Sequence, residues 1–267
     1  METNLLFVDD TRQRAALVRL QETTDKLNEI FAANILIQPG YFLSENEIED
    51  NISSYRFITK QTEIDNAVFP LSHGVDDNDV FIGIEAELTV DNRSATTSPL
   101  VTPQTYNNIF HFTAANTGTP AHITCIFNSV WSYQVGATTY IQNQTTRKFF
   151  RIPATQQSAA NNNSLYTGNR LVDQDGYIVI SGKATTKLML DLNTPAAFAG
   201  AGIGGTVNIL SFLMYGFTLQ NGAGFANFYT GGISLAPYEL KYANKNKGIE
   251  RAKWETLEME NSFGNMK

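Results

Sequence analysis

The side chains best suited to chemistry in this sequence are acidic, and one cluster of them precedes a strand-like stretch. Asp76, Asp77 and Asp79 surround Asn78, and oxygen-rich runs of this kind can hold a hard cation such as Ca²⁺. The run lacks the ligand order and the central glycine of an EF-hand loop. We therefore favour a solvated turn leading into Val80 over a metal site.

Two further groups of carboxylates carry weaker signals. Asp173 and Asp175 precede Gly176, and because Asp-Gly favours a tight hairpin turn, a turn is preferred over metal binding. Glu85 and Glu87 lie on one face of a predicted strand, as one half of a glycosidase pair could. Nothing in the sequence brings a partner carboxylate to them.

Histidine and cysteine, the usual residues of acid–base and nucleophilic catalysis, are scarce. His73, His111 and His122 are scattered, and no two have the spacing of a helical zinc pair. Cys125 is the single cysteine, and its strand-like surroundings favour a buried structural role. Neither G-x-S-x-G nor H-E-x-x-H occurs. We predict that the protein is not an enzyme and has no catalytic, cofactor-binding or metal-binding residues.

Gly200, Gly202 and Gly205 match the G-x-G-x-x-G pattern of dinucleotide-binding loops. That fingerprint requires a strand before the glycines and a helix after them, because the phosphate lies on the first amides of the helix. In this sequence a strand-like stretch follows the glycines. The pattern therefore indicates a loop, over residues 194–205, and not a nucleotide site.

Aromatic residues concentrate between residues 131 and 150. On a strand they could form a stacking platform for sugars or single-stranded nucleic acid. Few positive charges lie nearby, so packing in the core and across strands is the favoured interpretation. The residues concerned are Trp131, Tyr133, Tyr140, Phe149 and Phe150.

The elements that must position these side chains are unusually poor in charge. Residues 92–238 contain only ten charged side chains, seven basic and three acidic, whereas an ordinary domain is about a quarter charged. Protein interfaces are depleted in Lys, Glu and Asp, so such a surface is suited to meeting other protein surfaces. The net charge of −7 and the absence of a basic cluster argue against a protein that binds nucleic acid phosphates.

The N-terminal part predicts an amphipathic helix over residues 10–33, capped by Asp10 or Thr11. Pro39-Gly40 is expected to stop it. Ser44 followed by Glu47 has the pattern of a capping box and predicts a short acidic helical turn. The apolar seam of the long helix consists of Leu17, Leu20, Leu27 and Phe31.

From residue 55 onward the pattern is typical of strands rich in β-branched and aromatic residues and bounded by turn residues. The expected strands are residues 55–60, 80–90, 109–113, 122–135, 138–142, 148–152, 177–180, 187–192, 207–219 and 233–242. The expected turns are residues 91–92, 116–118, 135–136, 175–176, 181–182 and 221–222, and the expected exposed loops are residues 94–105, 156–164 and 194–205. With helix confined to the two ends, the predicted fold class is all-β, with an N-terminal amphipathic helix and a short C-terminal helix.

The order and texture of these elements over about residues 40–243 are similar to those of a viral family. The residues that carry the similarity are Tyr55-Arg56-Phe57, Val68-Phe69-Pro70-Leu71, Asp77-Asn78-Asp79-Val80-Phe81, Val130-Trp131-Ser132-Tyr133 and Arg151-Ile152-Pro153-Ala154-Thr155-Gln156. In this respect the chain resembles the jelly-roll major capsid proteins of tailless icosahedral phages. The family supplies no catalytic residues to carry over.

The resemblance implies a double jelly roll, in which two eight-stranded β-sandwiches stand side by side in one chain. About 13 strand-like segments are visible, fewer than sixteen, so a single elaborated roll stays open. The expected organisation is an arm and helix over residues 1–40, a first roll over residues 41–155, a second roll or the remainder of one roll over residues 156–244, and a charged tail over residues 245–267.

The resemblance further implies a major capsid protein that assembles as homotrimers into an icosahedral shell around the genome. Its expected partners are other copies of itself, vertex proteins and, through the N-terminal helix, an internal membrane, without sequence-specific nucleic acid binding. The charged N-terminus predicts no secretion signal, and the expected location is the virion, assembled in the host cytoplasm. The alternatives are a phage tail, fibre or spike protein, or a carbohydrate-binding β-sandwich; an enzyme is the least favoured.

Overall fold

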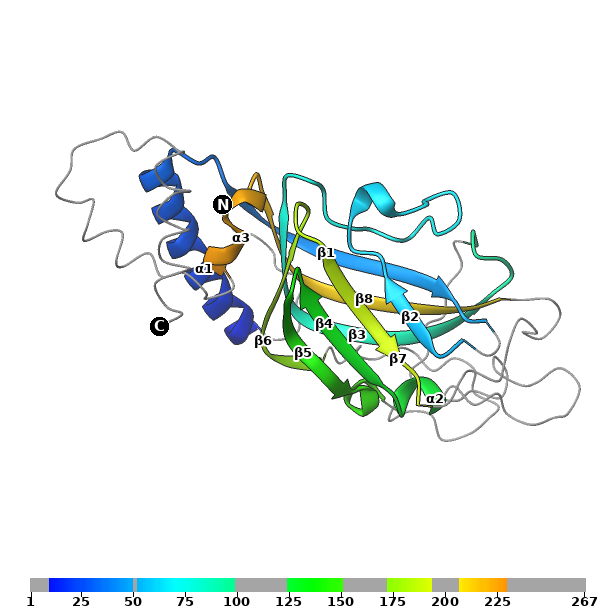
Figure 1. Cartoon of the computed structure of the whole chain (residues 1–267). Helices are drawn as coiled ribbons and strands as arrows, with labels where there is room; N and C mark the ends of the chain where they lie inside the picture. The colour runs from blue at the N-terminus through cyan, green and yellow to red at the C-terminus, as the bar shows by residue number, and fades with distance from the viewer. Residues whose placement is uncertain (1–9, 50–51, 99–123, 151–171, 194–206, 230–267) are drawn as a thin grey trace, which may run out of the picture.

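A computed structural model describes residues 10–49, 52–98, 124–150, 172–193 and 207–229 (Figure 1). Eight strands, β1 to β8, dominate these residues. They span Leu36–Glu47, Ser54–Phe57, Val80–Arg93, Val130–Val135, Thr138–Thr145, Val172–Ser181, Thr186–Asp191 and Val207–Gln220. The helices are α1 (Asp10–Phe31), α2 (Thr124–Phe127) and α3 (Ala226–Tyr229), with 3-10 turns η1 (Gln61–Glu63), η2 (Thr146–Phe149) and η3 (Ala223–Phe225).

The strands form two antiparallel sheets of four. One has the order β1-β8-β3-β6 and the other the order β2-β7-β4-β5. Each sheet therefore mixes strands from early and late in the sequence. This arrangement confirms the prediction of a mainly β protein with helical appendages.

The two sheets pack face to face around one apolar core. Phe212 of β8 lies at its centre, with ring centroids 5.2 Å from Phe57 on β2 and 5.6 Å from Trp131 on β4. All three side chains are buried. Aromatic pairs at such distances add stability beyond the area that they bury, so these contacts fix how one sheet lies on the other.

An irregularity in the middle of β3 exchanges the two faces of that strand. The register with β6 and β8 shifts between Gly83 and Glu85. Before the shift Phe81 faces the core between the sheets, and after it Ala86 and Leu88 do. Because side chains alternate along a strand, Glu85 and the odd-numbered residues that follow it point to the outer face of the sheet.

Gly216 of β8 allows this irregularity. A Cβ atom at Gly216 would lie 1.8 Å from the carbonyl oxygen of Ile82. Gly216 is the register partner of both Gly83 on β3 and Gly40 on β1. Only glycine permits the backbones to approach so closely.

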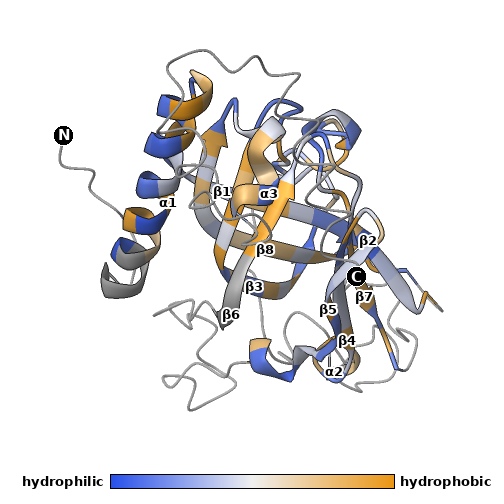
Figure 2. Cartoon of the chain, turned by 60° about the vertical axis from the view of Figure 1, so that its left-hand side comes forward, coloured by the Kyte–Doolittle hydropathy of each residue, from blue (hydrophilic) through white to orange (hydrophobic). Residues whose placement is uncertain are grey.

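Helix α1 packs on the outer face of the β1-β8-β3-β6 sheet, at one end of the molecule beside α3 (Figures 1 and 2). Its buried residues Ala16, Leu20 and Leu27 belong to a second apolar cluster with Ile82 and Phe217 of the sheet. The predicted amphipathic helix is confirmed, and its apolar side is used within the chain. Among the described residues no helix is both long and apolar enough to cross a membrane.

The region after α1 differs from the expectation. Pro39-Gly40 and the segment from Ser44 to Glu47 lie inside β1, and the predicted acidic helical turn is wrong. All twelve residues of β1 pair with β8, and this long-range ladder overrides the local capping pattern. Pro39 is tolerated because β1 is an edge strand, where a missing amide donor need not break a ladder.

Four other local predictions are corrected. Asp91-Asn92 continues β3 and does not form a turn. Asp175-Gly176 lies within β6, in a stretch where the register with β3 shifts and four β6 residues stand opposite Ile84 alone. The expected strand over residues 122–135 is interrupted by α2, which contains Cys125. Of the strand expected over residues 148–152, residues 148–149 belong to η2 instead, and residues 151–152 lie outside the described residues. In each case tertiary pairing or a helical turn prevails over local propensity.

The turns at residues 135–136, 181–182 and 221–222 are confirmed, with positive φ at Gly136 (56°) and Asn221 (61°). Residues 94–98 form bends and turns, as the first predicted loop requires. The predicted strands at residues 109–113 and 233–242, the turn at residues 116–118, the loop at residues 156–164, most of the loop at residues 194–205 and the C-terminal helix lie outside the described residues.

The expected boundary at residues 155–156 also lies outside the described residues. Strands from before and after it share both sheets: β1 pairs with β8, and β2 pairs with β7.

Candidate functional site

The acidic cluster at Asp76 to Asp79 forms an exposed turn before β3, as expected. The backbone amide of Asp79 donates to the carbonyl oxygen of Asp76 (2.9 Å). The carboxylate of Asp79 accepts a hydrogen bond from the backbone amide of Asn221 (3.0 Å). This contact joins the turn to the end of β8. Within the described part of the chain, no three His, Cys, Asp or Glu residues are grouped as metal ligands would be.

The other candidates from the sequence are dispersed. Asp173 and Asp175 lie on β6, but the structure does not describe their side chains. Five other candidates lie wholly outside the described residues: Gly200, Gly202, Gly205, His111 and His122. His73 is exposed and stacks against Tyr41, with 4.9 Å between ring centroids. Cys125 is half-buried, and desolvation raises the pKa of its thiol, which weakens it as a nucleophile.

The aromatic cluster belongs mainly to the core, which confirms that interpretation over a stacking platform. Trp131, Tyr133 and Phe149 are buried between the sheets. The hydroxyl of Tyr133 donates to the carbonyl oxygen of Val179. Burial raises the pKa of Tyr133, with a further contribution from Tyr140 and an opposing one from that hydrogen bond. Tyr140 is 51% exposed.

The most distinctive polar feature is a buried acidic face on the outer side of the β1-β8-β3-β6 sheet. After the irregularity, every second side chain of β3 points to this side of the sheet. The register of β1 on β8, and of β8 on β3, places Glu45 of β1 on the same side. We define the acidic face as Glu45, Glu85, Glu87, Asp91 and Arg93, each at most 5% exposed. It contains four carboxylates and one guanidinium, an arrangement that is costly to bury without compensation.

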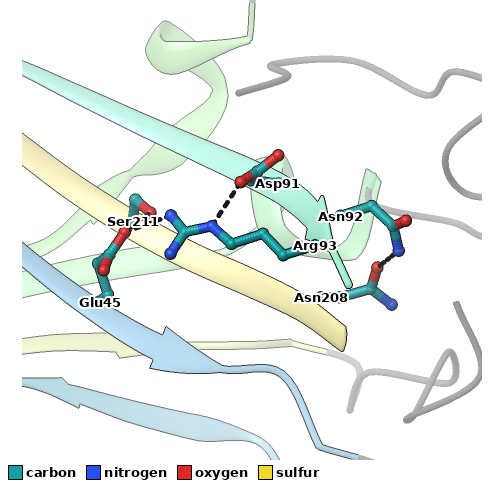
Figure 3. A network of polar contacts seen from close by, with 6 residues as sticks. All are labelled: Glu45, Asp91, Asn92, Arg93, Asn208 and Ser211. Atoms are coloured by element: carbon teal, nitrogen blue, oxygen red, sulfur yellow. Dashed lines mark hydrogen bonds and ion pairs between the residues drawn. The ribbon is translucent and has the colours of Figure 1, made fainter. Parts of the chain in front are cut away.

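Arg93 is the centre of a hydrogen-bonded network at one end of the acidic face (Figure 3). Its Nε donates to Asp91 Oδ2 at 2.6 Å, and one of its terminal nitrogens donates to Glu45 Oε1. Ser211 lies on β8 between them, and its hydroxyl donates to the same oxygen of Glu45 (3.4 Å). The network therefore joins β3, β8 and β1 across the sheet.

The electrostatics of Arg93 follow from its partners. Burial lowers the pKa of the guanidinium, but the hydrogen bonds that it donates to Glu45 and Asp91, and its attraction to their negative charges, outweigh that effect and raise the pKa. Arg93 is therefore a permanent positive charge. Two buried atoms of the network, Glu45 Oε2 and Arg93 Nη1, have no hydrogen-bond partner among the described residues.

Beyond Arg93, a second contact joins the same two strands. The side-chain amide of Asn92 donates to Asn208 Oδ1 at 2.8 Å (Figure 3). Asn92 and Asn208 are register partners on β3 and β8. Together with the Arg93 network, this contact fixes the ends of both long strands next to each other.

The other end of the acidic face lies beside Tyr215 of β8. Tyr215 is the register partner of Glu85 on one side and of Tyr41 on the other. Desolvation raises the pKa of the Tyr215 hydroxyl, and the negative charges of Glu87 and Glu85 raise it further. The carboxylates that the sequence placed on one strand face thus act together on a third side chain.

Sequence reasoning missed Glu45 and Arg93 as members of a site. Glu45 was hidden by the wrong assignment of its segment to a helical turn. Arg93 followed a predicted turn at residues 91–92, so its spacing of two from Asp91 was not interpreted as a shared strand face. The alternation of side chains in the strand predicted over residues 80–90 continues through Asp91 and Arg93, and this continuation was the signal that could have revealed the network.

Compared with known proteins, the sequence matches no protein-family model and none of the curated proteins. The interpretation of function therefore depends on the fold, the acidic face and the surface of this chain.

Proposed function

We propose that this protein is a structural virion protein, a jelly-roll subunit that assembles with identical copies into a capsid shell. The observation that carries the proposal is the strand order. Among the described residues, the orders β1-β8-β3-β6 and β2-β7-β4-β5 match those expected of two interlocking Greek keys, which supports a jelly roll. Double-sheet jelly rolls of this kind occur in viral capsid and lectin domains.

The same strand order favours a single roll over two. In a double roll, each half of the chain would complete its own pair of sheets. Here β1, before the expected boundary, pairs with β8, after it, and the core residues Phe57, Trp131 and Phe212 are shared. A single roll accounts for these pairings among the described residues.

The exposed surface supports assembly. Strand β5, at the edge of the second sheet, has mostly exposed side chains and contains no charged residue. Neutral hydroxyl and amide groups can be buried against another copy without the desolvation cost of ions. We expect such surfaces to meet in a homotrimer and then in a closed shell, in the virion.

Native mass spectrometry of the purified full chain tests the proposal. We expect a species of three copies of the 29.6 kDa chain, increasing with protein concentration. A strict monomer at every concentration and ionic strength would overturn the proposal.

A carbohydrate-binding sandwich is the second candidate, since lectins share jelly-roll architecture. The observation in its favour is Tyr41, which is 47% exposed and stacks on His73. A glycan array separates the two functions. Binding that is lost in Tyr41→Ala, by a protein that stays monomeric, would favour the carbohydrate-binding module.

A further inference from the structure

The sequence contains one Asn-Gly pair, Asn221-Gly222, at the point where β8 ends and η3 follows. Asparagine is among the chemically labile residues, and a following glycine makes it more so. Because glycine has no Cβ atom, its backbone nitrogen can approach and attack the side-chain amide of the asparagine. Asn221 is exposed and Gly222 is buried. The contacts of the two residues therefore decide whether this pair reacts.

Asn221 is held by two hydrogen bonds to other parts of the chain. Its backbone amide donates to Asp79 Oδ1 (3.0 Å), in the turn before β3. Its side-chain nitrogen donates to the carbonyl oxygen of Asn34 (3.1 Å), in the link between α1 and β1. A carbonyl oxygen only accepts hydrogen bonds, so the atom that faces Asn34 must be the amide nitrogen. The side chain therefore joins the end of β8 to the α1–β1 link.

The nitrogen that would attack is engaged as well. The backbone amide of Gly222 donates to the carbonyl oxygen of Leu219 at 3.2 Å. Attack requires this amide to lose its proton, and a hydrogen bond donated by the neutral form disfavours that loss. Both reacting groups are therefore restrained in the folded chain. Reaction requires a local opening, which proteins undergo at a lower free energy than global unfolding.

We propose that Asn221 is a deamidation site, which reacts when its contacts with the α1–β1 link and with the turn before β3 open. The Gly222 nitrogen loses its proton and forms a bond to Asn221 Cγ. The bond from Cγ to Nδ2 breaks, and ammonia leaves with that proton. Water then opens the cyclic imide to aspartate or isoaspartate, and neither an oxidant nor a reductant takes part. The reaction belongs to the isolated chain and does not depend on the capsid function.

The product cannot restore the original contacts. A carboxylate at position 221 has no proton to donate to the carbonyl oxygen of Asn34, and it adds a negative charge near Asp79. Isoaspartate also lengthens the backbone where η3 begins. This turn packs on α1 through Phe225 and Phe31, with 5.6 Å between ring centroids. Deamidation should therefore loosen the helices from the sheet, and the change is irreversible.

Peptide mapping by mass spectrometry, after incubation of the full chain at mildly alkaline pH, measures the conversion of Asn221. In native buffer we expect a rate lower by about tenfold or more than in urea that unfolds the chain, because the rate follows the population of the open form. Asp79→Ala removes the acceptor of the Asn221 amide and should raise the native rate by about tenfold. Asp79→Asn keeps an acceptor, and the matched control Asp77→Ala removes an exposed carboxylate from the same turn. Both should react at the wild-type rate.

The consequence of the reaction is tested by two substitutions at the same position. Asn221→Asp reproduces one product, whereas Asn221→Gly removes the side chain and accommodates the positive φ of 61°. We expect the Asp variant to unfold at a lower urea concentration than the Gly variant, because it alone adds a charge near Asp79. If Asp79→Ala does not fold, the comparison of the wild type in native buffer and in urea decides. Equal rates in those two conditions, a wild-type rate in folded Asp79→Ala, or an Asp variant as stable as the wild type would overturn the proposal.

Discussion

At the scale of single residues, Arg93 connects two strands that are not neighbours in the sheet. Its guanidinium is buried and hydrogen-bonded to Asp91 and Glu45, which lie on two different strands. Removing one partner of a buried ion pair leaves the other charges uncompensated, which costs more than the net contribution of the intact pair. The network therefore adds a buried side-chain connection between β3 and β1 to the backbone ladders that each forms with β8.

Arg93→Met tests this role. We expect the free energy of unfolding to fall by about 3–5 kcal/mol, the range for breaking a buried pair, measured by urea denaturation. Arg56→Met is the matched control, because Arg56 forms a 3.7 Å ion pair with Glu63 at the surface and such pairs contribute about 0–1 kcal/mol. Equal effects of the two substitutions would contradict the role assigned to Arg93.

A second residue, Tyr229, makes the free energy of unfolding depend on pH in the alkaline range. Its hydroxyl lies 2.9 Å from that of Thr24, which joins α3 to α1. Burial raises the pKa of Tyr229 to about 12, opposed by this hydrogen bond. The folded state therefore holds the proton more tightly than the unfolded state, so the contribution is complete below pH 10 and is lost as pH rises through about 12.

Thermal unfolding of the wild type and of Tyr229→Phe from pH 8 to 12 measures this contribution. We expect the variant to be less stable by about 1 kcal/mol at pH 8, from the lost hydrogen bond, and to lose less stability than the wild type above pH 10. Taking the difference between the two proteins removes the effect of Tyr133 and Tyr215, which also have raised pKa values. Parallel curves above pH 10 would contradict the assignment.

At the scale of elements, the long strands β3 and β8 organise the molecule, and their glycines set the geometry. The shift between Gly83 and Glu85 gives β3 one face that is apolar beneath α1 and acidic farther along. Without the shift, alternation would direct Glu85 and Glu87 into the core between the sheets. The acidic face therefore exists because of a local irregularity in one strand.

Gly216→Ala tests the geometry of this irregularity. A Cβ atom would lie 1.8 Å from the Ile82 carbonyl oxygen, so the backbones of β3 and β8 must separate. We expect a loss of about 2–4 kcal/mol in the free energy of unfolding, as for other strained core substitutions. Gly136→Ala is the control: its Cβ meets no atom within 4 Å, and only its positive φ adds strain, costing about 1 kcal/mol. A smaller effect at Gly216 than at Gly136 would be inconsistent with the described packing.

The elements also show what sequence can and cannot predict. Helix α1 and strands β3, β5, β7 and β8 had clear local periodicity and were predicted close to their observed bounds. Strand β1 was missed because its local pattern is that of a capping box, whereas its structure depends on pairing with β8, far away in the sequence. The Arg93 network was missed for the same reason, since its partner Glu45 is brought near only by that pairing.

At the scale of the whole molecule, two surfaces with different roles emerge. The outer face of the β1-β8-β3-β6 sheet is covered at one end by α1 and α3, and it contains the acidic face. The β4–β5 side of the other sheet carries uncharged and mostly exposed or half-buried side chains. We infer that the first surface stabilises the subunit and that the second is available for contacts between subunits. A shell subunit needs both properties, a rigid body and neutral contact surfaces.

Electron microscopy of the purified full chain, across the conditions of pH, salt and concentration used for assembly, tests the central claim most directly. We predict closed particles of uniform diameter built from repeated copies of the chain. A field of dispersed single molecules under every condition would contradict the claim that this β-sandwich exists to form a shell.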